Sequence, residues 1–327
     1  MKWVFLAALS VLILFLGVSF LIKPEVIETT PKTTESQPEK EINLILVGDI
    51  MLNRGVEYKV QNEGNGDFKF PFLNIADYFK KADIVFGNLE GPISDKGLKV
   101  GSIYSFRNDP QAIEGLTYAG FNVLSLANNH AFDYGRQALE DTLLRLKNAD
   151  IDCTGAGFNE SESYSPVIKE IDGTKIAFLA YTNLGPETWK ASGDNSGIAW
   201  INDSDLKRIG EDIKSAGEKS DILIVSLHAG EEYQTEPNQF QVDFAKMAIE
   251  SGADVVVGHH PHVIQADGKY RESWIFYSLG NFIFDQNFSS QTMRGEIAEV
   301  IIKNKTIEGV NAREININDS FQPEIIQ

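Results

Sequence analysis

Short apolar runs alternate along this chain with segments of helical periodicity. The apolar runs are rich in β-branched residues and lie at 42–47, 84–86, 122–124, 222–225 and 255–257. Their uniform hydrophobicity is typical of strands that are buried on both faces. Segments with apolar residues at helical spacing occupy 136–148, 205–217 and 237–251. This alternation predicts an α/β fold with a largely parallel or mixed sheet.

A second group of strands is predicted with turn signals such as Asp172-Gly173 between its members. These segments lie at 166–171, 174–181, 274–278, 296–303 and 307–314. Close spacing across short turns is typical of antiparallel pairing. We therefore expect a second sheet that packs on the first.

The N-terminal residues predict a membrane anchor. Residues 3–22 carry no charge, and at helical rise they are long enough to cross the ~30 Å hydrocarbon layer. A cleaved secretory signal is the alternative, since Gly17-Val18-Ser19 offers small residues for cleavage. We expect an uncleaved signal-anchor at 1–22, a disordered tether at 23–41 and one domain at 42–327. The chain would then be a single-pass protein of the cell membrane, with its domain outside the cytoplasm.

The charge of the chain restricts its partners. The 29 Lys and Arg against 47 Asp and Glu give a net charge of −18. No stretch concentrates basic residues, and nucleic-acid binding needs such clusters to neutralise phosphates. We therefore exclude nucleic acid as a partner. A polyanionic substrate would need a locally positive pocket within this negative field.

Polar residues with metal-binding chemistry follow five of the predicted strands. All five histidines belong to this set, and ligands of open α/β sheets lie beyond the carboxyl ends of strands. Imidazole and carboxylate groups bind Zn, Fe and Mn. The sequence therefore predicts a site for one or two of these divalent ions. The candidate residues are Asp49, Asn88, Glu90, Asn129, His130, His228, His259, His260 and His262.

Each candidate also has a structural explanation when it is taken alone. Asp49 is an ordinary turn or cap residue after a glycine, and asparagines cap helices. Glu90 could be solvated, and His228 could be a hydrogen-bonded core histidine. His260 and His262 are harder to explain in this way, because a proline that fixes φ separates them at a strand end.

The motifs that carry these residues, taken in order, resemble the bacterial CapA family. They are Gly48-Asp49-Ile50-Met51-Leu52, Phe86-Gly87-Asn88-Leu89-Glu90, Leu126-Ala127-Asn128-Asn129-His130 with Asp133-Tyr134-Gly135, His228-x-Gly230-x-Glu232-Tyr233, Gly258-His259-His260-Pro261-His262-Val263 and Ser278-Leu279-Gly280-Asn281-Phe282. That family includes the PgsA-type proteins, is associated with poly-γ-glutamate capsule synthesis and belongs to the calcineurin-like metallophosphoesterase superfamily. The resemblance extends over about 42–290.

The resemblance implies a four-layer α/β/β/α sandwich of the metallophosphoesterase type. It also implies a catalytic role for His130, as an acid or oxyanion stabiliser beside the metal. Glu90 lies near the place of the superfamily's bridging aspartate. We expect substrate contacts from Asn88, His259 and Arg107, whose guanidinium suits a carboxylate or phosphate. The positions that match superfamily metal ligands are Asp49, Asn129, His228, His260 and His262.

The chain also departs from the superfamily pattern. Met51 stands where the first motif has a histidine ligand, and Asn88 stands where the second motif has an aspartate. His259 is additional, so the sequence leaves open which two of the three final histidines face the site. A single metal ion or an altered pair fits this pattern.

These residues favour a metal-dependent hydrolase that acts on poly-γ-glutamate, another anionic polymer or a precursor. In such a site a metal ion would supply an activated water to a phosphoryl or carbonyl group, and His130 would stabilise the developing charge or protonate the leaving group. Two alternatives remain open. The domain could be a non-catalytic subunit that binds the polymer or assembles with membrane synthase subunits. It could also be a metal-assisted epimerase that removes a proton α to a carbonyl.

Overall fold

The computed structural model describes residues 41–326, and these residues form two β-sheets that lie face to face. The first sheet has the strand order β16-β15-β14-β1-β2-β3-β4, and β13 also pairs with β1. Strands β1 to β4 and β13 are parallel, whereas β14, β15 and β16 pair antiparallel at one side. The bounds are β1 Ile42–Ile50, β2 Ile84–Leu89, β3 Val123–Ser125, β4 Asp152–Thr154, β13 Asn281–Ile283, β14 Arg294–Lys303, β15 Thr306–Ile317 and β16 Pro323–Ile325.

The second sheet has the order β11-β12-β10-β9-β7-β6. Its four central strands are parallel, and the edge strands β11 and β6 pair antiparallel. Its strands are β6 Val167–Ile171, β7 Thr174–Thr182, β9 Ile222–His228, β10 Val255–His259, β11 Asp267–Tyr270 and β12 Ser273–Phe276. A separate small sheet pairs β5 Ala156–Gly157 with β8 Gly197–Ile198.

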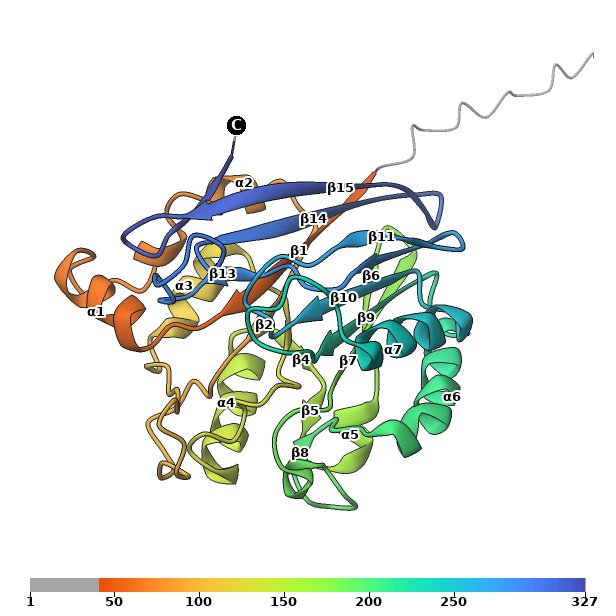
Figure 1. Ribbon diagram of the computed structural model, residues 1–327, viewed down its shortest axis with the longest axis horizontal. Coiled ribbons are helices and arrows are strands. Elements are labelled where there is room, and N and C mark those ends of the chain that lie inside the picture. The colour runs from red at the N-terminus through yellow and green to blue at the C-terminus, as the bar shows by residue number, and fades with distance from the viewer. Residues whose placement is uncertain (1–40, 327) are drawn as a thin grey trace, which may run out of the picture. The chain divides into compact units, whose positions relative to one another are not determined.

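Helices cover the outer face of each sheet. The apolar sides of α1, α3 and α4 pack on the first sheet, and those of α6 and α7 pack on the second, where Figure 1 shows both helices beside β9. The longer helices are α1 Arg54–Asn62, α3 Ala112–Ala119, α4 Arg136–Asn148, α6 Leu206–Gly217 and α7 Gln239–Glu250. The shorter ones are α2 Ala76–Phe79, α5 Glu160–Tyr164 and the 3₁₀ turns η1 Phe70–Phe72, η2 Glu187–Trp189 and η3 Asp203–Asp205.

A third apolar core lies between the two sheets. Phe86 of β2 stacks on Phe178 of β7 with ring centroids 5.6 Å apart, and Leu46, Ile224 and Val257 are fully buried around them. Burial of each such side chain contributes about 1.5–3 kcal/mol. The layers therefore follow the order helices, sheet, sheet, helices.

The predicted α/β fold is confirmed, but the predicted division into sheets is wrong. Strands β14 and β15 extend the first sheet beside β1, although we expected them in the second. Strands β9 and β10 form the centre of the second sheet, not part of the first. A uniformly apolar sequence indicates that a strand is buried on both faces. In both sheets, one face of each central strand packs against helices and the opposite face packs against the second sheet. The pattern alone therefore cannot assign a strand to a sheet.

The predicted membrane anchor at 1–22 and all but the last residue of the predicted tether at 23–41 lie outside the described residues. Within 41–326, no helix has the length and apolar character needed to cross a membrane.

Candidate metal centre

Strand pairing in the first sheet brings three polar side chains to one level. Strand β1 lies between β2 and β13, and its Asp49 pairs with Asn88 on one side and Asn281 on the other. The amide of Asn88 donates to Asp49 Oδ1 at 2.8 Å. A Cβ on the preceding Gly48 would lie 2.0 Å from the Gly280 carbonyl oxygen, so a glycine is needed where the chain approaches β13 so closely.

Strand pairing in the second sheet supplies the histidines. His228 of β9 is the register partner of His259 of β10. The chain then turns through His260 and His262 with φ angles of 97° and 58°, a conformation that costs about 1–3 kcal/mol for a non-glycine residue. The turn reaches the first sheet, since the backbone N–H of His260 donates to Asp49 Oδ2 at 3.1 Å. The carboxyl ends of both sheets therefore meet at Asp49.

His228 is held between two asparagines. Its Nδ1 lies 3.2 Å from Asn88 Nδ2, and its Nε2 lies 2.8 Å from Asn129 Oδ1. With Asn88 as the donor, Nδ1 accepts and Nε2 carries the proton. Burial lowers the pKa of His228 well below its ordinary value, so the ring is neutral, and a metal ion bound by it would take the place of one of these two hydrogen-bond partners.

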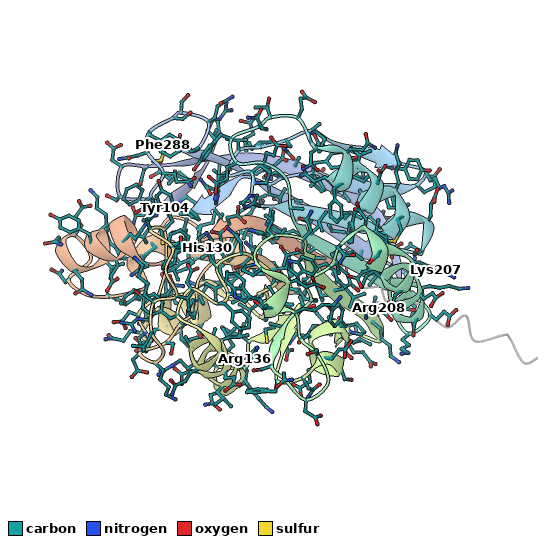
Figure 2. The ribbon with its side chains drawn as sticks, turned by 60° about the horizontal axis from the view of Figure 1, so that its bottom comes forward. Tyr104, His130, Arg136, Lys207, Arg208 and Phe288 are labelled. Atoms are coloured by element: carbon teal, nitrogen blue, oxygen red, sulfur yellow. The ribbon has the colours of Figure 1, made fainter. Side chains whose placement is uncertain are left out.

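His130 is oriented by its own loop. Its Nδ1 lies 2.7 Å from Asp133 Oδ2, and its ring stacks on Phe106 with centroids 4.0 Å apart. The side chain of Asn128 accepts from the His130 backbone N–H at 3.0 Å and so fixes the turn. This leaves Nε2 directed toward Glu90, whose Oε2 is 3.9 Å away. Figure 2 shows where His130 lies on this face of the molecule.

Glu90 is a fully buried carboxylate, and neither of its oxygens has a hydrogen-bond partner within 41–326. Burial, together with repulsion from Asp49, raises its pKa to about 7. An oxygen of Asp49, an oxygen of Glu90 and a ring nitrogen of His262 lie within 4.8 Å of one another. An unpaired buried carboxylate is costly, and a bound cation would compensate it. These residues therefore fit a divalent metal ion.

The charges of the other groups agree with this fit. Burial raises the pKa of Asp49, but the nearby rings of His259 and His262 outweigh it and hold that pKa well below its ordinary value. Burial and repulsion from His262 lower the pKa of His260 to about 3. Burial also disfavours a charge on His262, but Glu90 and Asp49 raise its pKa to about 9. Without a metal, a proton on His262 balances these carboxylates.

Most of the predicted site residues lie in this cluster. Asp49, Glu90, Asn129, His130, His228, His260 and His262 surround it, together with Asn88. His259 is fully buried with Nδ1 3.4 Å from Asp49 Oδ1, and neither ring nitrogen makes a hydrogen bond. The guanidinium of Arg107 lies 4.3 Å from the centroid of the Tyr134 ring.

Sequence reasoning assigned no role to Arg54. Its Nε donates to Asp285 Oδ2 at 3.2 Å, and its NH2 group also binds that carboxylate. The guanidinium lies 4.7 Å from the centroid of Phe106, the ring that stacks on His130. It lies 5.9 Å from Phe284, whose ring packs on that of His262. Arg54 is thus a cation that contacts the two phenylalanine rings packed on His130 and His262, and the sequence pattern gave no signal for it.

Sequence reasoning also gave no role to Glu232 and Asp133, although both lie in the motifs quoted above. A carboxylate oxygen of Glu232 lies within 4.8 Å of ring nitrogens of His260 and His262. Asp133 binds both His130 and the backbone N–H of Phe106, each at 2.7 Å. Glu232 follows His228, and Asp133 follows His130, within the same short motifs, and this proximity in the sequence could have indicated that both belong to the site.

Comparison with known proteins identifies relatives over most of the chain. Residues 43–286 match the model of the family "Bacterial capsule synthesis protein PGA_cap". "Capsule biosynthesis protein CapA" of Bacillus anthracis is 34% identical over 261 residues, which are 76% of this chain and 61% of that protein. "PGA biosynthesis protein CapA" of Bacillus subtilis (strain 168) is 33% identical over 291 residues, which are 88% of this chain and 74% of that protein.

Likeness to solved structures is weaker. A novel phosphatase from Mycoplasma pneumoniae aligns with a TM-score of 0.49 and 17% identity over 85% of this chain and 94% of that chain. The NAD nucleotidase of Haemophilus influenzae aligns with a TM-score of 0.47 and 12% identity over 88% of this chain and 60% of that chain.

Proposed function

This chain belongs to the PGA_cap family of bacterial capsule synthesis proteins, and on that premise we propose that it acts in the synthesis or export of poly-γ-glutamate or a related anionic polymer. We assign it a metal-dependent hydrolase site of the metallophosphoesterase type. The observation that carries this assignment is the fully buried Glu90, whose unpaired oxygens face Asp49 and His262.

One or two ions of Mn, Fe or Zn would be held by Asp49, Glu90, Asn129, His228, His260 and His262. This mixture of imidazole nitrogens with carboxylate and amide oxygens suits those metals. When bound, such an ion polarises a phosphoryl or carbonyl oxygen and activates water.

His130 would move the proton that the reaction requires. Asp133 holds Nδ1 at 2.7 Å, so the proton that is exchanged is the one at Nε2. That nitrogen faces Glu90 across 3.9 Å, at the edge of the proposed metal position. A positioned acid of this kind contributes about 10²–10⁴-fold to a rate.

The surroundings of the site favour an anionic and extended substrate. The chain carries a strongly negative net charge. The guanidinium of Arg54 nevertheless lies near the site, because it contacts Phe106 and Phe284. These two rings pack on His130 and His262. Exposed aromatic side chains lie close by: Tyr233 contacts Phe288 with centroids 5.2 Å apart, and its ring is 6.2 Å from that of His262. Phe288 and Tyr104 are labelled in Figure 2 on the same side of His130. Exposed aromatic side chains with a guanidinium nearby suit a polymer that passes across the surface.

We also propose that residues 1–22 anchor the domain outside the cell membrane, within reach of the membrane synthase subunits. The absence of charge from residues 3–22 supports this placement.

The test is complementation of a strain that lacks this chain. Plasmid-borne Asp49→Asn and His130→Ala variants should each fail to restore polymer, although they accumulate as folded protein. A Glu114→Gln variant, altered at an exposed position of α3, should restore it fully. Normal polymer with both site variants would contradict the hydrolase and favour a non-catalytic subunit that binds polymer or synthase.

A further inference from the structure

The loop that follows β9 carries a carboxylate to the solvent side of the site. Glu232 is exposed, whereas His260 and His262 are 7% and 2% exposed. One oxygen of Glu232 and one ring nitrogen of each histidine lie within 4.8 Å of one another. These three residues are thus a second group with metal-ligating atoms, and His262 belongs to both groups.

The backbone holds this loop in place. The N–H of Tyr233 donates to the carbonyl of Pro261 at 2.8 Å, which ties the loop to the turn that carries both histidines. Gly230 has a φ of 112°, and a Cβ there would lie 2.6 Å from Gln241 Oε1, so glycine allows the loop to turn here. The hydroxyl of Tyr233 accepts from Gln286 Nε2 at 3.2 Å. Glu232 therefore reaches the histidines from a defined loop.

An independent feature points to a ligand at this position. Nδ1 of His260 is buried and has no hydrogen-bond partner within 41–326. Buried polar atoms of this kind are rare in native proteins unless a water or an ion binds them. The His260 backbone is also held at a positive φ of 97°, a strain that is typical of functional sites.

We propose that Glu232, together with His260 and His262, is a metal ligand on the solvent side of the centre. Two histidines and one glutamate form a three-ligand set that leaves a coordination position open, as catalytic zinc sites do. A metal ion held by these three residues would supply a position for an anionic oxygen of a phosphoryl or carboxylate substrate. This inference rests on the proposed metal-dependent function and adds a ligand that Asp49 and Glu90 do not provide.

The test is a metal titration of the full-length protein after removal of bound ions with a chelator. Mn²⁺ and Zn²⁺ are titrated into the wild-type protein, Glu232→Gln and Glu231→Gln, in which the neighbouring exposed glutamate loses the same charge. We expect Glu232→Gln to lose one equivalent or to bind at least about tenfold more weakly, while Glu231→Gln binds as the wild type does. Because Glu232 is exposed, the substitution should leave the unfolding temperature of the metal-free protein unchanged.

Co²⁺ separates a ligand from a mere nearby charge. Replacement of a coordinating carboxylate should alter the visible absorption of the Co²⁺ protein in Glu232→Gln, and Glu231→Gln should keep the wild-type spectrum. Less than about tenfold weakening with full stoichiometry, or an unaltered Co²⁺ spectrum, would overturn the role of Glu232 and leave the proposed function standing. A wild-type protein that binds none of these ions would instead overturn both.

Discussion

Replacing Glu90 by glutamine should stabilise the metal-free protein, although it removes a proposed ligand. Glu90 is fully buried without a hydrogen-bond partner, and its pKa rises from 4.5 to about 7 because of burial and the charge of Asp49. The folded state therefore binds this proton more tightly than the unfolded state. The free energy of unfolding therefore falls as pH rises from about 4.5 to about 7. Above that range the folded protein bears the full cost of a charged, buried Glu90.

The size of the effect follows from the same pKa values. Moving the pKa of a carboxyl from 4.5 to about 7 corresponds to about 3 kcal/mol at about pH 8 and to about 1 kcal/mol at about pH 5. Glutamine has nearly the same volume and no charge. For a domain of this size, about 3 kcal/mol corresponds to a rise of roughly 6 °C in the unfolding temperature.

The assay is thermal and urea unfolding followed by circular dichroism, with chelator present, at about pH 8 and about pH 5. The wild-type protein is compared with Glu90→Gln and with Glu114→Gln, which alters an exposed carboxyl and should change stability by less than about 0.5 kcal/mol. Added Mn²⁺ or Zn²⁺ should reduce the difference in stability between Glu90→Gln and the wild type, because the wild type gains more binding free energy than the variant. The proposed cost of the buried charge would be wrong if Glu90→Gln were less stable than the wild type at about pH 8. It would also be wrong if the difference in stability between the two proteins did not shrink at low pH.

Three further predictions concern other parts of the molecule. Gly48→Ala should destabilise the fold by about 3 kcal/mol or more in the urea unfolding assay, since its Cβ would lie 2.0 Å from a carbonyl oxygen. Gly268→Ala is the control, because Gly268 has open space around it, and it should be nearly neutral. Asp133→Asn should lower turnover at least about tenfold with unchanged metal content, because it loosens His130; loss of metal from this variant would argue against a positioning role. Burial raises the pKa of Cys153 to about 12, so a thiol reagent should label native protein at about pH 8 at least about a hundredfold more slowly than unfolded protein, and equal rates would contradict the burial.

The sequence predicted the elements better than their arrangement. Segment 136–148 is a helix over that same range. Helix α7 begins at Gln239, two residues after Pro237, because Asn238 caps it and exchanges hydrogen bonds with Gln241. The division of strands between two sheets was not predictable, since each buried strand sees apolar neighbours on both faces whichever sheet it joins.

The site was predictable where its residues follow strands and less so where loops return to it. Asp49, Asn88, His228 and His259 are fixed by strand register, and the carboxyl ends of parallel strands lie at the same edge. Arg54 reaches the site from the start of a helix and depends on contacts with distant residues. Spacing along the chain does not report such contacts.

The proposed function depends on a metal ion in the cluster around Asp49 and Glu90. The most direct test is elemental analysis of the protein purified without chelator, beside a His260→Ala/His262→Ala variant that folds. We expect about one or two equivalents of Mn, Fe or Zn in the wild type and their loss from the variant. A folded wild-type protein that contains none of these metals, and takes up none on reconstitution, would contradict it.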